Sequence, residues 1–315
     1  MSSNPLVSII IPVYNGGDYL REAIDSALAQ TYAPIEVLVI NDGSNDSGVT
    51  KQIAEEYGDA IRYFEKENGG VSSALNCGIR HMRGTYFSWL SHDDFYDPRK
   101  IEVEVAALPE EKQKVVVYCN YATVDSNSAP MPDTKSSGRP QHNLSSHEAL
   151  HHVLRHGSLN GCGFLIPCQA FTECGLFDED LRYAQDALMW YRLFSNGWGV
   201  VVVKDQLVKS RVHQNQQTQK NRAKFTLDNQ KVCQRIAPTF NIISTREEDF
   251  VLEYAIRNAI KQERQNVRFC RQLMKKSGRL TCSASTRLMF MSAYGSVRPA
   301  IRKAYYRLFR KIQTQ

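Results

Sequence analysis

Two adjacent acidic side chains, Asp93 and Asp94, end the segment over residues 89–94, directly after a short apolar run. Adjacent carboxylates repel each other unless a cation or water screens them, and hard oxygen ligands suit Mg²⁺ or Mn²⁺. Such an ion can bind a diphosphate and neutralise the charge that develops as it departs. The alternative is a solvated loop that caps the next helix, but Asp97, followed by Pro98, already fills that role. The pair therefore predicts a metal site.

Two further segments have the residue types of a nucleotide site. Asp42 follows a strand-like run and can accept hydrogen bonds from a base or a ribose, although an Asp-Gly pair by itself is more often a turn. Asn68 precedes Gly69 and Gly70 at the start of a predicted helix, where backbone amides permit close approach of an anion. This segment has neither the Gly-x-x-x-x-Gly-Lys nor the Gly-x-Gly-x-x-Gly pattern, which argues against a P-loop ATPase and a dinucleotide-binding oxidoreductase.

Asp186 begins a helical pattern over residues 187–196. Taken alone, a carboxylate in this place is most simply a helix N-cap. The same group can act as a general base that removes a proton from an attacking hydroxyl. The residue types leave both alternatives open.

Alternating strand-like and helix-like runs must position these side chains. The alternation predicts an α/β fold with a largely parallel sheet, helices on both faces and ligands at the carboxyl ends of the strands. We expect residues 125–146 to form a long surface loop. The expected strands cover residues 6–13, 35–40, 61–64, 86–90, 115–124, 198–203 and 207–212. The expected helices cover residues 20–28, 48–57, 72–82, 99–108, 146–155 and 184–196. Asp18 is the expected cap of the first of these helices.

The chain of 315 residues is 42% hydrophobic and 23% charged, as in a soluble globular protein. No apolar stretch approaches the roughly 20 residues that cross a bilayer, so we expect neither secretion nor a membrane span. The eight cysteines lack the paired spacing of a zinc site, which favours free thiols in a reducing cytoplasm. We expect a catalytic domain over residues 1–239 and a basic helical region over residues 240–315.

Positive charge is concentrated near the C-terminus. Residues 241–315 hold 16 Lys/Arg and 5 Asp/Glu, a net charge of +11, so the preceding 240 residues carry −5 of the total +6. Within residues 297–312, one predicted helical face is apolar and is flanked by cations, which fits peripheral binding to anionic lipids at the cytoplasmic face of the inner membrane. A helix packed on the catalytic domain with a solvated basic face is an equal alternative. Nucleic acid is not an expected partner, because no recognised binding module accompanies the charge. The apolar face comprises Ile301, Tyr305, Leu308 and Ile312, and the flanking cations are Arg302, Lys303, Arg310 and Lys311.

Taken in order, these segments resemble glycosyltransferase family 2, whose members have the GT-A fold. The resemblance covers roughly residues 6–218 and implies a Rossmann-like, mostly parallel sheet, with helices on both faces, in a metal-dependent enzyme. The similar segments are residues 11–15, 41–44, 68–78, 84–94, 161–179, 185–192 and 211–218.

The resemblance also implies a role for individual residues. Asp42 would address the base, uracil or thymine, and Asp93 would be the principal ligand of Mn²⁺ or Mg²⁺. Asp186 would be the general base, since Trp190 and Arg192 stand at matching offsets. The implied nucleotide-binding residues are Pro12, Tyr14, Asn15, Asp42, Asn68, Asn76 and Asp93, and the implied metal-binding residues are Asp93, Asp94, through a bound water, and His213.

The implied function is inverting transfer of a sugar from a UDP- or dTDP-sugar to a hydroxyl of a glycan or lipid-linked acceptor, in the biosynthesis of cell-surface polysaccharide or glycolipid. Three positions depart from the family pattern: Ser91 replaces the first Asp of Asp-x-Asp, Leu75 replaces an Arg, and Gln185 replaces the Glu before the base. Two alternatives stay open. One is a catalytically inactive nucleotide-sugar-binding module, and the other is a sugar nucleotidyltransferase.

Overall fold

A computed structural model describes most of the chain. The described residues are 4–111, 113–132, 139–214, 216, 222–236 and 264–276, together with residues 252, 254, 255, 258, 284, 285, 288, 289, 291 and 292. They divide into two compact units. The first comprises residues 1–153 and 157–228, and the second comprises residues 154–156 and 229–315.

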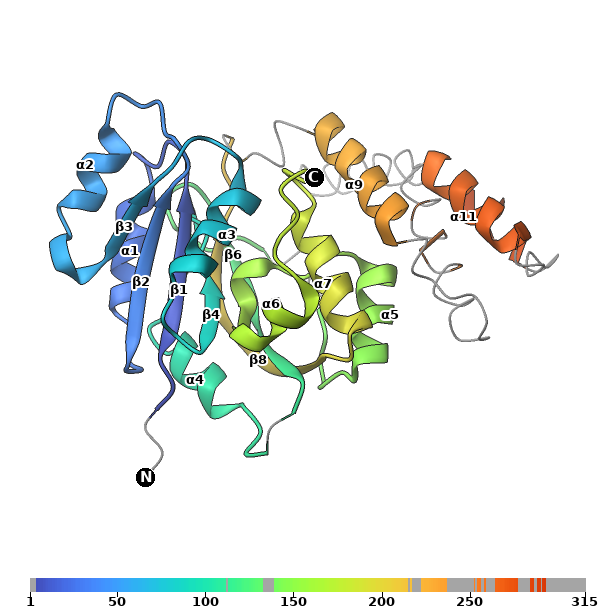
Figure 1. Cartoon of the computed structure of the whole chain (residues 1–315), viewed down its shortest axis with the longest axis horizontal. Helices are drawn as coiled ribbons and strands as arrows, with labels where there is room; N and C mark the ends of the chain where they lie inside the picture. The colour runs from blue at the N-terminus through green and yellow to red at the C-terminus, as the bar shows by residue number, and fades with distance from the viewer. Residues whose placement is uncertain are drawn as a thin grey trace, which may run out of the picture. The chain divides into compact units, whose positions relative to one another are not determined.

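The first unit is built on an eight-stranded sheet with the order β3-β2-β1-β4-β7-β6-β8-β5. Figure 1 shows β3, β2, β1 and β4 side by side. Strands β1 to β4 are parallel, and β6 pairs in parallel with β8. Strands β7 and β5 run antiparallel to their neighbours, so the predicted parallel α/β sheet is confirmed with two reversed strands. The strands are β1 Val7–Val13, β2 Ile35–Asn41, β3 Arg62–Glu65, β4 Tyr86–Trp89, β5 Phe95–Tyr96, β6 Val115–Val124, β7 Phe164–Pro167 and β8 Gly199–Arg211.

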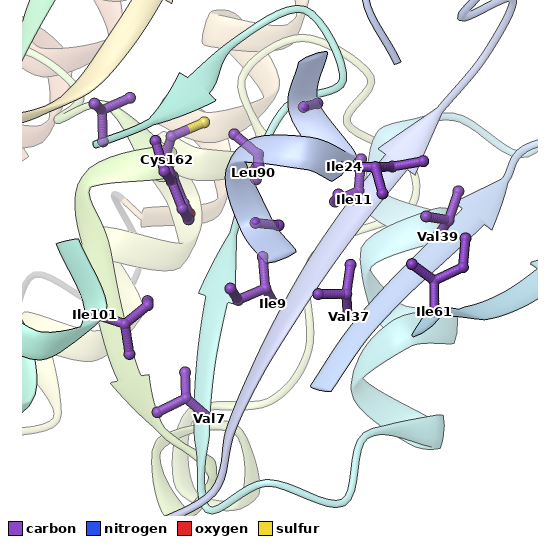
Figure 2. Packing of buried hydrophobic residues seen from close by; sticks show 14 of the residues in the cluster. Val7, Ile9, Ile11, Ile24, Val37, Val39, Ile61, Leu90, Ile101 and Cys162 are labelled. Carbon is purple, nitrogen blue, oxygen red and sulfur yellow. The ribbon is translucent and has the colours of Figure 1, made fainter. Parts of the chain in front are cut away.

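Alternate side chains of β1 supply two separate cores, because successive residues of a strand point to opposite faces. Figure 2 shows Val7, Ile9 and Ile11 in the first core, which also holds Ile24 of helix α1 (Leu20–Leu28). Ile10 belongs to the second core. Continuous burial along the strand therefore reflects a sheet covered on both faces.

Helices cover both faces of the sheet. Helices α1 (Leu20–Leu28), α2 (Val49–Glu55) and α4 (Lys100–Ala106) contribute to the first core. The second core contains residues of α3 (Val71–His81), α5 (Ser146–His156), α6 (Cys168–Cys174) and α7 (Gln185–Ser195). Among the described residues, this unit also contains two short 3-10 helices, η1 (Gly58–Ala60) and η3 (Gly161–Gly163), and the first part of α9 (Arg222–Ile236).

Local capping differs from the prediction at two helices. Tyr19, not Asp18, precedes α1, and no side chain caps this helix. Helix α4 begins at Lys100 after Arg99, although the Asp97 carboxylate still accepts a hydrogen bond from Arg99 N (3.1 Å). The prediction erred by one or two residues because backbone geometry, rather than residue type, fixes where a helix begins.

The sequence prediction missed β7 and α6, whose short apolar and mixed runs lack a clear period. The two strands expected over residues 198–203 and 207–212 form the single strand β8, which pairs with β6 through an irregularity after Cys119. In the second unit, α11 (Arg264–Lys276) agrees with the expected helical region. The basic face predicted over residues 297–312 lies outside the described residues.

Candidate active site

Asp42 lies at the carboxyl end of β2 and is almost fully buried. Its carboxylate accepts hydrogen bonds from Lys66 Nζ (2.8 Å), Gly69 N (3.0 Å) and Gly70 N (2.7 Å). Gly70 directly precedes α3 and has a φ of 88°, a conformation that favours glycine. Asp42 thus fixes the loop over residues 68–70. A carboxylate has about four lone-pair sites, so one site, on Oδ2, is left to accept a hydrogen bond from a ligand.

The loop after β1 is joined to the loop after β2. Asn15 has a φ of 55°, and its side chain exchanges two hydrogen bonds with Asn45, Asn15 Nδ2 to Asn45 Oδ1 (2.8 Å) and Asn45 N to Asn15 Oδ1 (2.9 Å). Pro12 is buried within β1, whereas the adjacent loop residue Tyr14 is 36% exposed. The exposed ring is therefore available to stack on a base, whereas buried Pro12 is part of the strand itself.

Asn68 and Asn76 have different surroundings. Asn68 Nδ2 donates to the backbone oxygen of Asp42 (2.8 Å), which places Asn68 in the Asp42 loop. Asn76 is buried in α3, and its amide nitrogen donates to Phe177 O (2.8 Å) and Glu179 Oε1 (2.9 Å). Both amide hydrogens are then in use, so a direct donor contact from Asn76 Nδ2 to a nucleotide would require one of these bonds to break.

Asp93 and His213 lie side by side. His213 Nε2 is 3.0 Å from Asp93 Oδ2, and both side chains are mostly buried. Burial alone would raise the pKa of Asp93, but the hydrogen bond from His213 and the nearby imidazole charges hold that pKa below its ordinary value. His213 also contacts the Tyr19 ring edge-on, with centroids 5.1 Å apart. A carboxylate suits Mn²⁺ and Mg²⁺, and an imidazole can bind Mn²⁺, when a diphosphate and water complete the coordination.

Asp94 has hydrogen-bond partners outside this pair. Its carboxylate accepts hydrogen bonds from Arg211 N (2.8 Å) and the Cys162 thiol (3.5 Å). Burial and the charge of Asp93 raise the pKa of Asp94 to about 8. Among the described residues, no cluster of three or more His, Cys, Asp or Glu side chains is arranged to hold a metal. The structure therefore brings together Asp93 and His213 of the predicted metal ligands, whereas a direct contribution from Asp94 is disfavoured by its internal bonds.

Arg211 is the first residue of the segment 211–218, and no separate role was predicted for it. In the structure it organises this region. Its side chain is 1% exposed and stacks over the Tyr19 ring at 4.3 Å. The residue also fixes the start of the His213 segment, since its backbone oxygen accepts from Gln216 Nε2 (2.8 Å). The guanidinium donates to Asp93 O (2.9 Å), Asp125 O and Ser126 O (both 3.3 Å), and Ser128 Oγ (2.9 Å), and it forms an ion pair with Glu22.

Asp186 lies in the first turn of α7 and is not its N-cap. The N-cap position is Ala184, which provides no side-chain hydrogen bond. Asp186 Oδ1 accepts from Ala187 N (2.7 Å), and Asp186 Oδ2 accepts from the Ser158 hydroxyl (2.6 Å). The half-buried carboxylate is thus held by defined partners and does not serve as the cap that its position in the sequence suggested.

Residues 157–162 contact two acidic side chains of the site, Asp186 and Asp94. Ser158, near one end, contacts Asp186, and Cys162, at the other end, contacts Asp94 and Ser91. Trp190 Nε1 donates to Leu159 O (3.0 Å) and so anchors the same segment to α7. We call residues 157–162 the linking segment. No residue pattern in the sequence distinguished Ser158, which is one exposed serine among many.

The loop that precedes Asp186 is held from two sides. Ser72 Oγ of α3 donates to Leu181 O (2.8 Å). The buried Asp228 of α9 accepts from Arg182 N (2.7 Å) and Tyr183 N (2.8 Å). Helix α3 therefore links the Asp42 loop at its N-terminus to the loop that leads into the candidate base.

A model of the family described as glycosyl transferase family 2 matches residues 8–179, more than half of the chain. The chain belongs to glycosyltransferase family 2. The chain is similar to an uncharacterized glycosyltransferase of Rickettsia prowazekii, RP339. The two are 48% identical over 220 residues, which cover 68% of this chain and 66% of RP339. The chain covers about a third of three longer relatives from the same genus. The family assignment made from ordered motifs is thereby confirmed.

Solved structures agree with the fold expected of family 2. S. aureus TarS 1–349 in complex with UDP-GlcNAc is similar with a TM-score of 0.68 and 17% identity, over 95% of this chain and 92% of that chain. The Pyrobaculum calidifontis mannosyltransferase PcManGT, in complex with GDP-Man and Mn²⁺, has a TM-score of 0.60 and 17% identity, over 99% of this chain and 85% of that chain. The GT-A fold is confirmed. No helix among the described residues combines the length and apolar character that would span a bilayer.

Proposed function

We propose that this chain transfers a sugar from a nucleoside diphosphate sugar to a hydroxyl acceptor, with inversion at the anomeric carbon. The observation that carries the proposal is the linking segment, which contacts the Asp186 carboxylate near one end and the Asp94 carboxylate at the other. Asp94 is next in the chain to Asp93, which contacts His213. A base for the acceptor and a binding group for the leaving diphosphate are thereby parts of one rigid arrangement. Such positioning is a main source of enzymatic rate enhancement.

Asp186 acts as the general base. It takes the proton of the acceptor hydroxyl while that oxygen forms a bond to the anomeric carbon, and the bond from this carbon to the nucleoside diphosphate breaks. Asp93 and His213 would hold a Mn²⁺ or Mg²⁺ ion, which when bound neutralises charge on the departing diphosphate. The Mn²⁺ in the PcManGT complex and the proximity of Asp93 and His213 support this cofactor.

A UDP- or dTDP-sugar is the proposed donor. Asp42 presents a carboxylate that only accepts hydrogen bonds, so it suits the N3–H of uracil or thymine. The exposed Tyr14 ring can stack on the same base. The UDP-GlcNAc complex of TarS supports a uridine donor. A glycan or lipid-linked hydroxyl, in cell-surface polysaccharide or glycolipid synthesis, is the proposed acceptor class.

Incubation with a nucleotide-sugar library, Mn²⁺ and a panel of glycan acceptors, followed by mass spectrometry, tests the proposal. We expect a free nucleoside diphosphate and a glycosylated product from the wild-type chain. Asp186→Asn should lower kcat by about 10³-fold or more while donor affinity changes less than about twofold. Release of pyrophosphate would instead indicate a nucleotidyltransferase, and donor binding without turnover by the wild-type chain would indicate a binding module.

We further propose peripheral attachment at the cytoplasmic face of the inner membrane through the basic face over residues 297–312. The net charge of +11 over residues 241–315 supports this placement. Full-length protein should sediment with vesicles that contain phosphatidylglycerol and not with neutral vesicles, and 0.5 M salt should release it. Replacement of the four flanking cations, Arg302, Lys303, Arg310 and Lys311, by Gln should abolish sedimentation, and equal binding to both vesicle types would contradict the proposal.

A further inference from the structure

We propose that Ser158 is a positioning residue for the general base, acting through the hydrogen bond from its hydroxyl to Asp186 Oδ2. The bond is short, at 2.6 Å, and joins residues 28 positions apart in the chain. The inference rests on the proposed function, because it assumes that Asp186 takes the proton of the acceptor.

The backbone at Ser158 is fixed by its neighbours. Trp190 Nε1 donates to Leu159 O (3.0 Å), and Trp190 lies one helical turn after Asp186 on α7. The Asn160 side chain accepts from Cys162 N (2.9 Å), which stiffens the other end of the linking segment. The segment therefore makes bonds to two successive turns of α7, and Ser158 supplies the bond at the turn that carries the base.

The hydrogen bond selects one orientation of the carboxylate. Ala187 N donates to Asp186 Oδ1, and the Ser158 hydroxyl donates to Asp186 Oδ2, so each oxygen has a defined partner. A hydroxyl that donates to a carboxylate favours the charged form, which is the form that acts as a base.

The position of Ser158 separates this role from a role in folding. The side chain is exposed, so its loss leaves no cavity. Its hydroxyl also lies 3.2 Å from Leu159 O, a second acceptor within the loop itself. Replacement of Ser158 should therefore affect the protonation and orientation of Asp186 far more than the stability of the protein.

The test compares Ser158→Ala and Ser158→Thr in the full-length chain, with Ser195→Ala as a matched control. Ser195, like Ser158, is an exposed serine, but it lies at the end of α7 and its hydroxyl donates to a backbone oxygen, Arg192 O. For Ser158→Ala, we expect kcat to fall about tenfold, donor KM to change less than about twofold, and the acidic limb of the kcat/KM profile to move up by about one pH unit. Ser158→Thr, which keeps a hydroxyl, should restore most of kcat, and Ser195→Ala should match the wild type.

Three results would overturn the inference, and the first two concern activity. One is a Ser158→Ala enzyme with unchanged kcat and an unchanged acidic limb, and the other is equal loss in the Ala and Thr variants. A lowered thermal midpoint with an unmoved pH profile would assign Ser158 to loop stability alone and would also reject the inference. Asp186→Asn separates this failure from that of the proposed function. If it retains turnover, Asp186 is not the base, whereas if it is inactive and Ser158→Ala is unaffected, only the role of Ser158 is rejected.

Discussion

His213 Nε2 lies 3.0 Å from Asp93 Oδ2, although 120 positions separate the two residues in the chain. The contact joins the segment after β4 to the segment after β8. Arg211, two residues before His213, donates to the backbone oxygen of Asp93 and fixes the approach of the two segments. The pair is therefore built by the fold before any donor arrives.

The pair predicts a metal-dependent defect in Asp93→Asn. Because an amide is a weaker ligand than a carboxylate, Mn²⁺ should no longer strengthen donor binding, and affinity with Mn²⁺ should fall at least about tenfold. In EDTA, the variant and the wild type should bind the donor within about twofold of each other. Calorimetric titration of UDP-sugar with and without Mn²⁺ measures both quantities. Asp59→Asn, at an exposed acid far along the chain, is the control, and an Mn²⁺ response equal to that of the wild type would reject the role of Asp93.

Asp94 predicts a specific pH dependence of metal-free stability. Its pKa is raised to about 8 in the folded protein, against about 3.9 in an unfolded chain. The folded state then binds the extra proton, so this contribution to stability is full below about pH 4 and is lost as pH rises toward 8. In urea unfolding experiments with EDTA, the free energy of unfolding of Asp94→Asn, relative to that of the wild type, should rise by at least about 1 kcal/mol from pH 5 to pH 9. An Asp94→Asn curve that runs parallel to that of the wild type over this pH range would contradict the assignment.

A buried ion pair beneath the site predicts a large loss of stability in Lys100→Met. Lys100 Nζ lies 2.7 Å from Glu104 Oε2, and both side chains are fully buried. Removal of the cation leaves Glu104 without its charged partner, which should cost about 3 kcal/mol or more. Lys100→Met combined with Glu104→Leu should recover much of this loss. Lys51→Met, which removes two exposed ion pairs, should cost less than about 1 kcal/mol. Equal losses in urea unfolding for Lys100→Met and Lys51→Met would show that burial is unimportant here.

Close packing in the linking segment predicts a defect in Gly161→Ala. A Cβ at this position would lie 2.3 Å from the Trp89 ring, so the segment must shift. We expect a loss of about 3 kcal/mol and a large loss of turnover, since Ser158 and Cys162 lie in the same segment. Gly197→Ala is the control: that position has a φ of 90° but open space, so it should cost about 1 kcal/mol with turnover intact. Equal turnover in the two variants would show that the linking segment does not position the base.

Much of the fold could be predicted from the sequence because its signals are local. The apolar runs that became β1, β2 and β6 and the period of α3 are strong, and they were located to within one or two residues. Strand β7 was missed because its pairing with β4 and β6 is antiparallel and is set by distant neighbours.

The sequence likewise identifies some residues of the candidate site and not others. Asp42, Asp93 and Asp186 stand out as acids at the ends of predicted elements, so residue type and place identified them. Ser158 and Lys66 carry no such signal, because their importance comes only from hydrogen bonds that the folded chain creates. The orientation of the Asp94 carboxylate likewise depends on Arg211 N, which no local pattern indicates.

Asp228 sets a practical limit on how this catalytic unit can be divided. Two backbone amides just before the base, those of Arg182 and Tyr183, donate to its buried carboxylate. The family model ends at residue 179 and the sheet ends at Arg211, so both suggest natural places for a cut or a graft. A shortened or chimeric enzyme that ends there would leave these amides unpaired, and exchange of acceptor-binding regions between relatives should therefore retain the chain through at least Asp228.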